Sequence, residues 1–273
     1  MILPPPKKSF GQNFLKDQGV LARIVEAVKI APGDLLLEVG PGRGALTRLL
    51  AEQGAQVVAV ELDRQLVPLL EAEFAGNQNV HVVNADILRL DLPDLLKGRG
   101  AGIWKVAANL PYNISSQVLF KFLEERRLFS RLVLMLQREV GERLLAGPGG
   151  KEYGILSVLF PMYFTVRREF LVRPGAFFPA PKVESMVLSF EPLPAPLFTL
   201  VDEQIFRRLV RAAFGQRRKT LWNCLKGAGF APTDQALQEV LSVCGIDPGR
   251  RGETLTPEEY ARLANGLAAL GQP

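Results

Sequence analysis

The chain of 273 residues is long enough for one large domain and a smaller one, and its 48% hydrophobic content can build a core. A net charge of +5 and a pI near 9.3 are compatible with a polyanionic partner. Two cysteines and one histidine argue against a metal cluster, a disulfide framework and a serine-protease triad. The first residues lack a signal-peptide core, and no apolar run reaches membrane-spanning length. We therefore expect a cytoplasmic protein without a metal site.

Strand and helix patterns alternate along the first half of the chain. Short apolar or β-branched runs predict strands at 35–39, 56–61, 80–84, 104–108 and 131–136. Helical periodicity predicts helices at 45–53, 64–74, 115–126 and 138–145. The histidine, His81, lies inside one expected strand, so we interpret it as a structural residue. Such alternation predicts an α/β fold with a mostly parallel sheet covered on both faces.

The pattern changes after the glycine-rich residues 147–150. A helix is expected from Tyr153, followed by strands near 163–170 and 184–190 that can form an antiparallel edge of the sheet. Three prolines within 191–196 indicate a linker. Beyond it only helical patterns occur, at 203–214, 219–226, 234–242 and 257–267. The expected domains are a sheet domain over 1–191, including a basic, partly mobile arm at 1–17, and a small all-α domain over 197–273.

The loop after the first expected strand indicates a nucleotide-like cofactor. Gly40, Gly42 and Ala45 fit the G-x-G-x-x-G/A pattern, whose glycines let a ligand approach the backbone closely. Glu61, at the end of the second strand, is placed to bind a ribose. No Gly-Lys-Ser/Thr follows, so a Walker phosphate loop is excluded. The loop alone does not separate a nicotinamide dinucleotide from S-adenosylmethionine.

Two further strand ends favour S-adenosylmethionine. The third expected strand is followed by Asp86, which can accept a hydrogen bond from an adenine amino group, and the fourth by Asn109. Together with Glu61 they offer ribose, adenine and methyl-transfer contacts at three successive strand ends. The alternatives are that Asp86 is an N-cap or turn former and that Glu61 is a solvated strand end.

The quartet Asn109-Leu110-Pro111-Tyr112 suits methylation of an amino group on a planar base. The Asn109 side-chain oxygen and the Leu110 carbonyl can each accept an N–H of the adenine amine. Pro111 restricts the backbone of Leu110, and Tyr112 can stack on the base. Open α/β sheets bind ligands at this carboxyl edge. The alternative is an ordinary strand-to-helix turn, in which Asn and Pro are common.

With these motifs the chain resembles the bacterial ribosomal small-subunit RNA adenine dimethyltransferases of the KsgA type over nearly its whole length. The residues that carry the resemblance are 8–15 (KSFGQNFL), 38–42 (EVGPG), 109–115 (NLPYNIS), 177–185 (FFPAPKVES), 210–214 (VRAAF) and 217–221 (RRKTL). The resemblance implies a Rossmann-like S-adenosylmethionine-dependent methyltransferase fold. It also implies transfer of methyl groups to N6 of two adjacent adenosines near the 3′ end of 16S ribosomal RNA.

The resemblance adds three residues to the expected site. In the family the segment at 12–15 folds over the methyl donor, which implies cofactor contacts from Asn13 and Leu15. It further implies that Phe177 packs against the target base opposite Tyr112. The alternative for Phe177 is core packing, because Phe178 is an equally good stacking candidate by composition.

Local charge predicts RNA binding. The segment 204–226 carries basic residues and no acid, so it is a candidate phosphate-binding surface, although charge runs are often only solvated helix faces. The residues expected to bind RNA are Lys7, Lys8, Arg207, Arg208, Arg211, Arg217, Arg218 and Lys219.

Four other functions are weighed against this reading. A large-subunit RNA dimethyltransferase is the nearest, and a DNA adenine methylase is disfavoured because position 110 is Leu and no second target-recognition domain is visible. A ribosome-assembly factor whose binding matters more than its catalysis stays open. A nicotinamide-dependent oxidoreductase would be favoured only if that dinucleotide bound instead. We expect a monomer that acts on the small ribosomal subunit.

Overall fold

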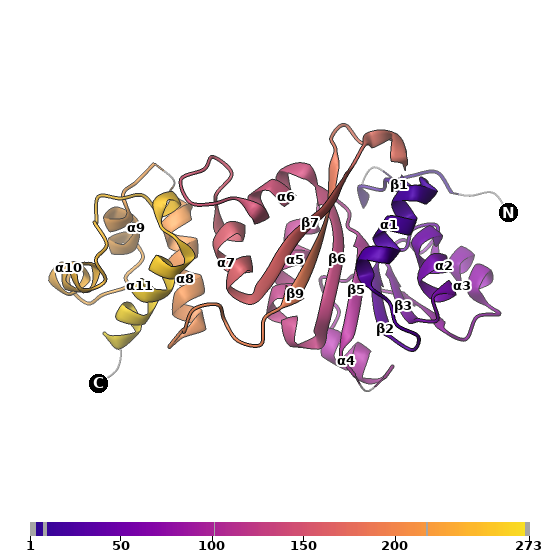
Figure 1. Ribbon diagram of the computed structural model, residues 1–273, viewed down its shortest axis with the longest axis horizontal. Coiled ribbons are helices and arrows are strands. Elements are labelled where there is room, and N and C mark those ends of the chain that lie inside the picture. Colours follow the sequence, from indigo (N-terminus) through magenta and orange to yellow (C-terminus); the bar gives the residue numbers. More distant parts are fainter. Residues whose placement is uncertain (1–3, 8–9, 101, 217, 271–273) are drawn as a thin grey trace. The chain divides into compact units, whose positions relative to one another are not determined.

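The computed structural model describes residues 4–7, 10–100, 102–216 and 218–270 of the chain. The chain divides into two compact units, which Figure 1 shows in ribbon form. The sheet unit consists of Met1–Gly141 and Val166–Pro192. The helical unit consists of Glu142–Thr165 and Leu193–Pro273.

A seven-stranded sheet with the order β4-β3-β2-β5-β6-β9-β7 is the framework of the sheet unit (Figure 1). The strands from β4 to β6 run parallel to their neighbours, and β9 runs antiparallel to β6. The strands are β2 (Leu35–Val39), β3 (Gln56–Glu61), β4 (Val80–Asn84), β5 (Trp104–Asn109), β6 (Phe129–Gln137), β7 (Phe164–Val172) and β9 (Ser185–Pro192). The mostly parallel sheet with an antiparallel edge is thereby confirmed.

The parallel strands end in register at one edge of the sheet. Val39 is the partner of both Val60 and Ala108 on the neighbouring strands. The residues that follow these three partners along the chain are Gly40, Glu61 and Asn109, which therefore lie side by side. The strands β2, β3 and β5 are mostly buried because both faces of a parallel sheet are covered, whereas β4 at the edge of the sheet is partly exposed.

The strand order places a topological switch point between β2 and β5. From β2 the chain moves outward to β3 and β4, and it then returns to β5 on the other side of β2. The loops that follow β2 and β5 therefore diverge and leave a crevice, which is where open α/β sheets bind ligands.

Helices α1 and α2 pack against each other, and both contact the sheet. Asp17 caps the start of α1 by accepting a hydrogen bond from the Val20 N–H, and Lys29 ends it in the left-handed conformation. Neither α1 nor α4 was predicted. The helices of this part of the chain are α1 (Gln18–Val28), α2 (Ala45–Glu52), α3 (Val67–Phe74), α4 (Leu92–Lys97), α5 (Ser115–Glu124) and α6 (Arg138–Leu145).

Residues 14–17 of the expected arm are attached to the rest of the sheet unit. Strand β1 (Phe14–Leu15) pairs antiparallel with β8 (Phe177–Phe178) in a separate two-stranded sheet. The backbone N–H groups of Lys16 and Asp17 both donate to the Ala176 carbonyl. This part of the arm is held by backbone hydrogen bonds that a single-sequence pattern does not reveal.

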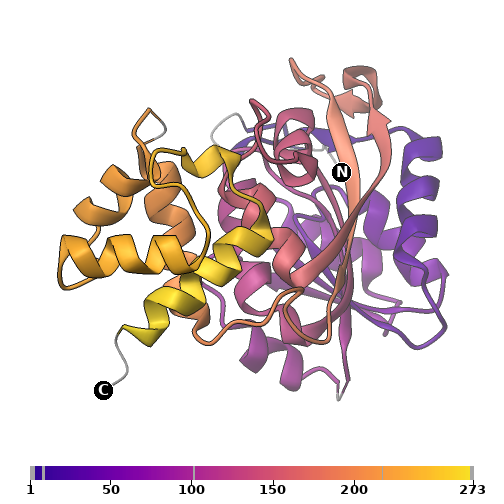
Figure 2. The same cartoon turned by 60° about the vertical axis from the view of Figure 1, so that its left-hand side comes forward.

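The helical unit packs α8 (Glu203–Gly215) against α7 (Ile155–Tyr163), α9 (Leu221–Gly227) and α11 (Pro257–Ala269), and α10 (Asp234–Val243) against α11. Figure 2 shows α8 to α11 gathered together, in orange to yellow. We had expected segment 142–165 in the sheet domain of residues 1–191. It belongs instead to the helical unit, because α7 packs on α8 and α11. None of the described helices is long and apolar enough to cross a membrane.

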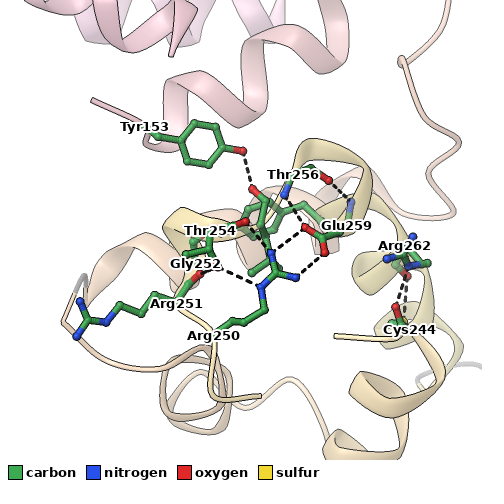
Figure 3. A network of polar contacts seen from close by, with 11 residues as sticks. Tyr153, Cys244, Arg250, Arg251, Gly252, Thr254, Thr256, Glu259 and Arg262 are labelled. Carbon is green, nitrogen blue, oxygen red and sulfur yellow. Dashed lines mark hydrogen bonds and ion pairs between the residues drawn. The ribbon is translucent and has the colours of Figure 1, made fainter. Parts of the chain in front are cut away.

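Arg250 organises the loop before α11 (Figure 3). Its guanidinium donates to the Glu259 carboxylate at 2.5 Å and to the Thr254 carbonyl at 2.6 Å. Glu259 in turn accepts from the backbone N–H of Thr256, the N-cap of α11. Tyr153, which lies just before α7, donates to the Leu255 carbonyl at 2.8 Å. This hydrogen bond connects the residues before α7 to the loop before α11.

Candidate active site

A pocket of about 350 Å³ lies at the carboxyl ends of β2, β3, β4 and β5 in the sheet unit. It is the place that the switch point predicts. Residues 10–16 of the arm line the pocket from the side opposite the strand ends. The predicted site residues that line it are Asn13, Leu15, Gly40, Gly42, Glu61, Asp86, Asn109, Leu110, Pro111 and Tyr112.

The glycine loop after β2 has a backbone that other residues rarely adopt. Gly40 and Gly42 have φ of 70° and 62°, in the left-handed region. A Cβ on Gly42 would lie 3.0 Å from the Phe14 ring, so this glycine also admits the arm. The Gly40 N–H donates to the Val60 carbonyl at 2.9 Å, which holds the loop against β3. The loop therefore forms a close-fitting wall between the sheet and the arm.

Two buried carboxyl groups lie at the back of the pocket. Glu61 accepts the N–H groups of Gly42 at 3.0 Å and Asp63 at 2.8 Å, and burial raises its pKa. Glu38 is 2% exposed, and burial, with a smaller contribution from Glu61, raises its pKa to about 8. Within the part of the chain that the structure describes, no group hydrogen-bonds to the Glu38 Oε2. That oxygen is a buried polar atom of the pocket without a hydrogen-bond partner among the described residues, as is the Arg43 Nε, and Glu38 received no role from the sequence.

Asp86 combines two roles that the sequence analysis had treated as alternatives. Its Oδ1 accepts the Leu88 N–H at 3.0 Å, and Oδ2 lies 3.6 Å from the Arg89 guanidinium, so it forms the turn after β4. It also lines the pocket. A turn former at this position can present its carboxylate to a ligand without losing its local hydrogen bond.

Hydrogen bonds to the arm and to β6 hold the quartet after β5. The Asn109 Nδ2 donates to the Asn13 carbonyl at 3.1 Å. An amide oxygen accepts and an amide nitrogen donates, so the Oδ1 of Asn109 is the atom of this side chain that can accept from a ligand. The Leu110 N–H donates to the Met135 carbonyl at 3.2 Å and ties the turn to β6. The Asn109 Oδ1 and the Leu110 carbonyl are the acceptors of this turn that a bound amine could use.

Tyr112 has a partner that the sequence did not predict. Its hydroxyl lies 2.7 Å from the Oγ of Ser185, the fully buried first residue of β9. Burial raises the pKa of Tyr112, so the phenol stays protonated in this environment. A hydrogen bond at the far end of the ring restricts its orientation at the pocket wall.

The structure separates the two phenylalanines of β8. Phe177 is 2% exposed and belongs to the core cluster with Leu15 and Leu21, whereas Phe178 is 52% exposed and lines the pocket. Successive residues of a strand point to opposite faces, so only one of the two rings reaches the pocket. Phe178 is therefore the ring of this segment that lines the pocket in this structure, and the contact of Phe177 with a bound base stays a prediction.

Arg43 lies between aromatic rings at the pocket. Its guanidinium is 4.5 Å from the centre of the Phe14 ring and 6.0 Å from that of Phe178. The same side chain donates to the Pro4 carbonyl at 3.2 Å. Arg43 thus connects the glycine loop, the arm and β8.

Lys7, which the sequence analysis assigned to RNA, forms an ion pair inside the sheet unit. Its ammonium lies 2.6 Å from the Asp63 carboxylate, whose side chain is 3% exposed. The sequence analysis assigned no role to Asp63, although its position two residues after Glu61 could have marked it as a site residue. Lys8 and Arg217 lie outside the described residues.

The remaining basic residues differ in exposure. Arg208, Arg211, Arg218 and Lys219 are exposed, and Arg208 lies 4.4 Å from the centre of the Phe230 ring. Arg207 is partly buried, lies 3.8 Å from Glu203 and faces the Tyr163 ring at 5.7 Å. Arg208 and Arg211 share a face of α8, since they are three residues apart. The exposed residues are the better candidates for phosphate contacts.

Comparisons with known proteins agree with this geometry. The model of the family described as ribosomal RNA adenine dimethylase matches residues 6–269. Ribosomal RNA small subunit methyltransferase A of Geobacter metallireducens is 60% identical over 265 residues, which cover 97% of this chain and 96% of the relative. The protein of the same name from Alkaliphilus oremlandii is 45% identical, covering 96% of this chain and 91% of the relative.

Two solved structures resemble the whole chain. A dimethyladenosine transferase from Plasmodium falciparum has a TM-score of 0.78 and 26% identity, over 92% of this chain and 95% of that chain. The 23S rRNA methyltransferase ErmE has a TM-score of 0.69 and 26% identity, over 94% of this chain and 100% of that chain. The fold of both units therefore recurs in RNA methyltransferases.

Proposed function

Because this chain belongs to the ribosomal RNA adenine dimethylase family, we propose that it methylates adenosine N6 in ribosomal RNA with S-adenosylmethionine as methyl donor. The substrate is 16S RNA in the small ribosomal subunit, and the product is N6,N6-dimethyladenosine at two adjacent positions near the 3′ end. The observation that carries the proposal is that the Asn109 quartet and the Gly40 loop open on one pocket. We place the reaction in the cytoplasm and assign it to a monomer.

The pocket fits a nucleoside with an amino-acid tail. Glu61 is placed for the ribose hydroxyls and Asp86 for the adenine amino group. The backbone of Gly40 and Gly42 allows close approach of the ligand, and the orphaned Glu38 Oε2 offers a buried polar contact. Further contacts would come from Asn13, Leu15 and Asn109. When bound, S-adenosylmethionine supplies an electrophilic methyl group on a sulfonium.

The residues of the chain position the amine. Asn109 Oδ1 and the Leu110 carbonyl accept its N–H groups, which favours a pyramidal nitrogen whose lone pair faces the methyl group. Tyr112 stacks on the base. No strong general base is needed, because the amine becomes acidic as it is alkylated and its proton can pass to water. Positioning of this kind can contribute roughly 7 to 11 kcal/mol.

The target base must leave its stack before it enters the pocket. Flipping costs a few kcal/mol, and aromatic stacking returns about 1 to 3 kcal/mol per base. Phe178 lines the pocket together with Phe10, Phe14 and Tyr112, and we assign it to the face of the base that Tyr112 does not cover. The assignment of Phe177 to that contact is the weaker one, since its ring is in the core.

A methyltransferase for large-subunit RNA is the nearest alternative. The resemblance to ErmE supports it, but at 26% identity, whereas relatives named small subunit methyltransferase A reach 60%. A role in subunit assembly is compatible with the main proposal. The exposed basic residues of the helical unit favour binding of structured RNA in either case.

Incubation with labelled S-adenosylmethionine and unmethylated small subunits tests the function. Nucleoside analysis of the RNA is expected to show N6,N6-dimethyladenosine, whereas large subunits should stay unlabelled. Absence of the product from small subunits at every stage of maturation would contradict the proposal, and labelling of large subunits would favour the alternative.

Reversing exposed charges of the helical unit is expected to weaken binding to small subunits. In the variant Arg208→Glu/Arg211→Glu/Lys219→Glu, the slope of log K against log salt should become shallower by about 1 for each lost phosphate contact. Filter binding across a salt series measures the slope. The control is Lys97→Glu/Arg99→Glu, which reverses exposed charges in the sheet unit. Equal slopes for all three proteins would remove these residues from the RNA surface.

Loss of the Ser185 hydroxyl is expected to slow methyl transfer through Tyr112. Ser185→Ala and Tyr112→Phe should each lower kcat by about 2- to 10-fold, the value of one hydrogen bond, and leave the KM for S-adenosylmethionine unchanged. The double variant should be no worse than either single one, because both remove the same bond. Ser189→Ala is the matched control, since Ser189 is a buried serine of the same strand that does not line the pocket. Additive losses would contradict the positioning role of Ser185.

A further inference from the structure

Asp63 is a buried residue that contacts the arm and also Glu61, which lines the pocket. Its Oδ1 accepts the Lys7 ammonium at 2.6 Å and the Gln65 N–H at 3.0 Å. Its Oδ2 accepts the Gln12 Nε2 at 2.9 Å. Burial alone would raise its pKa, but these hydrogen bonds outweigh burial and lower it, so Asp63 remains a carboxylate. The residue is therefore a charged anchor that binds two side chains of the arm.

The arm is also attached on the other side of the pocket. The Asn13 carbonyl accepts the Asn109 amide at the end of β5, whereas Asp63 follows the end of β3. Residues 10–16, which include Gln12 and Asn13, line the pocket without interruption. At Gly11 an added Cβ would lie 2.8 Å from the Asn113 Oδ1, so the arm passes close to the loop after β5. The arm thus bridges the pocket from β3 to β5.

The anchor is coupled directly to the predicted ribose ligand. The Asp63 N–H donates to Glu61 Oε1 at 2.8 Å, while Glu61 Oε2 accepts from Gly42. The same residue therefore holds the arm with its side chain and Glu61 with its backbone. Lys7 and Gln12 also bind each other, since the Lys7 N–H donates to Gln12 Oε1 at 2.8 Å. The two arm residues engage Asp63 as one unit.

We propose that Asp63 is a positioning residue that latches the N-terminal arm over the cofactor pocket through Lys7 and Gln12. The inference rests on the proposed function only for the identity of the ligand. The arm forms one wall of the pocket, so a cofactor enters and leaves when the latch opens. Each dimethylation needs two cofactor exchanges. In this proposal the strength of the contact between Lys7 and Asp63 helps to determine how long the cofactor stays bound.

Hydrogen exchange and cofactor binding on the full-length protein test the latch. Lys7→Met and Asp63→Asn should each speed exchange of the amides in 10–16 without any cofactor present. Each should weaken binding of S-adenosylhomocysteine, the probe in calorimetry, by about 10-fold, as expected for loss of a hydrogen bond to a charged group. A loss of methylation should appear in the KM for S-adenosylmethionine more strongly than in kcat, because the contact is not made by the reacting atoms.

The chain offers a matched control pair. Asp34 lies 2.6 Å from Lys105, the same distance as in the latch, at the start of β2 and outside the pocket lining. Asp34→Asn should leave exchange in 10–16 and cofactor affinity unchanged. Lys7→Met guards against misfolding of the Asp63 variant, because the Lys7 side chain is 30% exposed and lies on the arm.

The latch would be overturned if Lys7→Met left both arm exchange and affinity at the values of the unaltered protein, or if Asp34→Asn weakened binding equally. Failure of the proposed function is distinguishable. A protein that binds the probe and responds to Lys7→Met, but does not methylate small subunits, retains the latch and loses the proposed substrate. If the protein does not bind S-adenosylhomocysteine at all, hydrogen exchange of the amides in 10–16 still tests the latch.

Discussion

Asn109→Ala is expected to lower kcat for methylation of small subunits by about 100-fold or more. The change removes an acceptor that holds the amine in line with the methyl group, and small losses of positioning in such reactions cost about that much. It also removes the donor to the Asn13 carbonyl. A modest weakening of cofactor binding should therefore accompany the loss of rate. Single-turnover methylation of unmethylated small subunits, with affinity measured separately, resolves the two effects.

Two further variants identify the atom responsible. Asn109→Asp keeps an acceptor oxygen but not the donor to Asn13, so it should retain more activity than Asn109→Ala. Asn113→Ala changes an exposed amide in the same turn, and it should keep kcat near that of the unaltered protein. If Asn109→Ala kept full activity, the quartet would be only a turn, which was the alternative considered from the sequence.

Phe177→Ala and Phe178→Ala are expected to have opposite consequences. Phe177 is in the core, so its truncation should lower the free energy of unfolding by about 3 to 5 kcal/mol. Phe178 is exposed at the pocket, so its truncation should spare stability and lower kcat/KM for the subunit by about 5- to 150-fold, the value of one stacked base. Denaturant unfolding and initial rates of methylation, measured on both variants, make the comparison.

Leucine substitutions give the sharper control. Phe177→Leu keeps much of the core volume and should restore most of the lost stability, whereas Phe178→Leu lacks the aromatic face and should stay slow. If Phe177→Leu were as stable as the unaltered protein but strongly impaired in methylation, Phe177 would contact the base after all. The structural placement of the two rings would then not describe the state that binds RNA.

The strands were predictable because of how a parallel sheet is built. Strands buried on both faces, such as β2 and β3, are short apolar runs, and these two and the edge strand β4 begin and end at the predicted residues. The helices α1 and α4 were missed, although Asp17 and Asp91 cap them. The helix pattern of α1 lies directly beside the expected arm, and α4 has only six residues with a proline in its first turn. Both patterns are weak without the contacts that stabilise the helices.

The boundary between the units shows a second kind of limit. Prolines at 191–196 predicted a division there, and the last of the three boundaries between the units follows Pro192. The grouping of 142–165 with the C-terminal helices depends on α7 packing against α8 and α11. Those partners are some 40 to 100 residues away in the chain, so no local pattern carries the information.

The sequence by itself determined the types and order of the strand-end residues: glycines after β2, Glu61 after β3, Asp86 after β4 and Asn109 after β5. Parallel register brings such residues together, so one pocket could be expected. Only the tertiary structure decided which side chains close that pocket. The binding of Lys7 by Asp63, the binding of Tyr112 by Ser185 and the position of Phe178 at the pocket all depend on contacts between segments distant in sequence. Periodicity reports the face of a single element, and it carries no information about which distant side chain that face will meet.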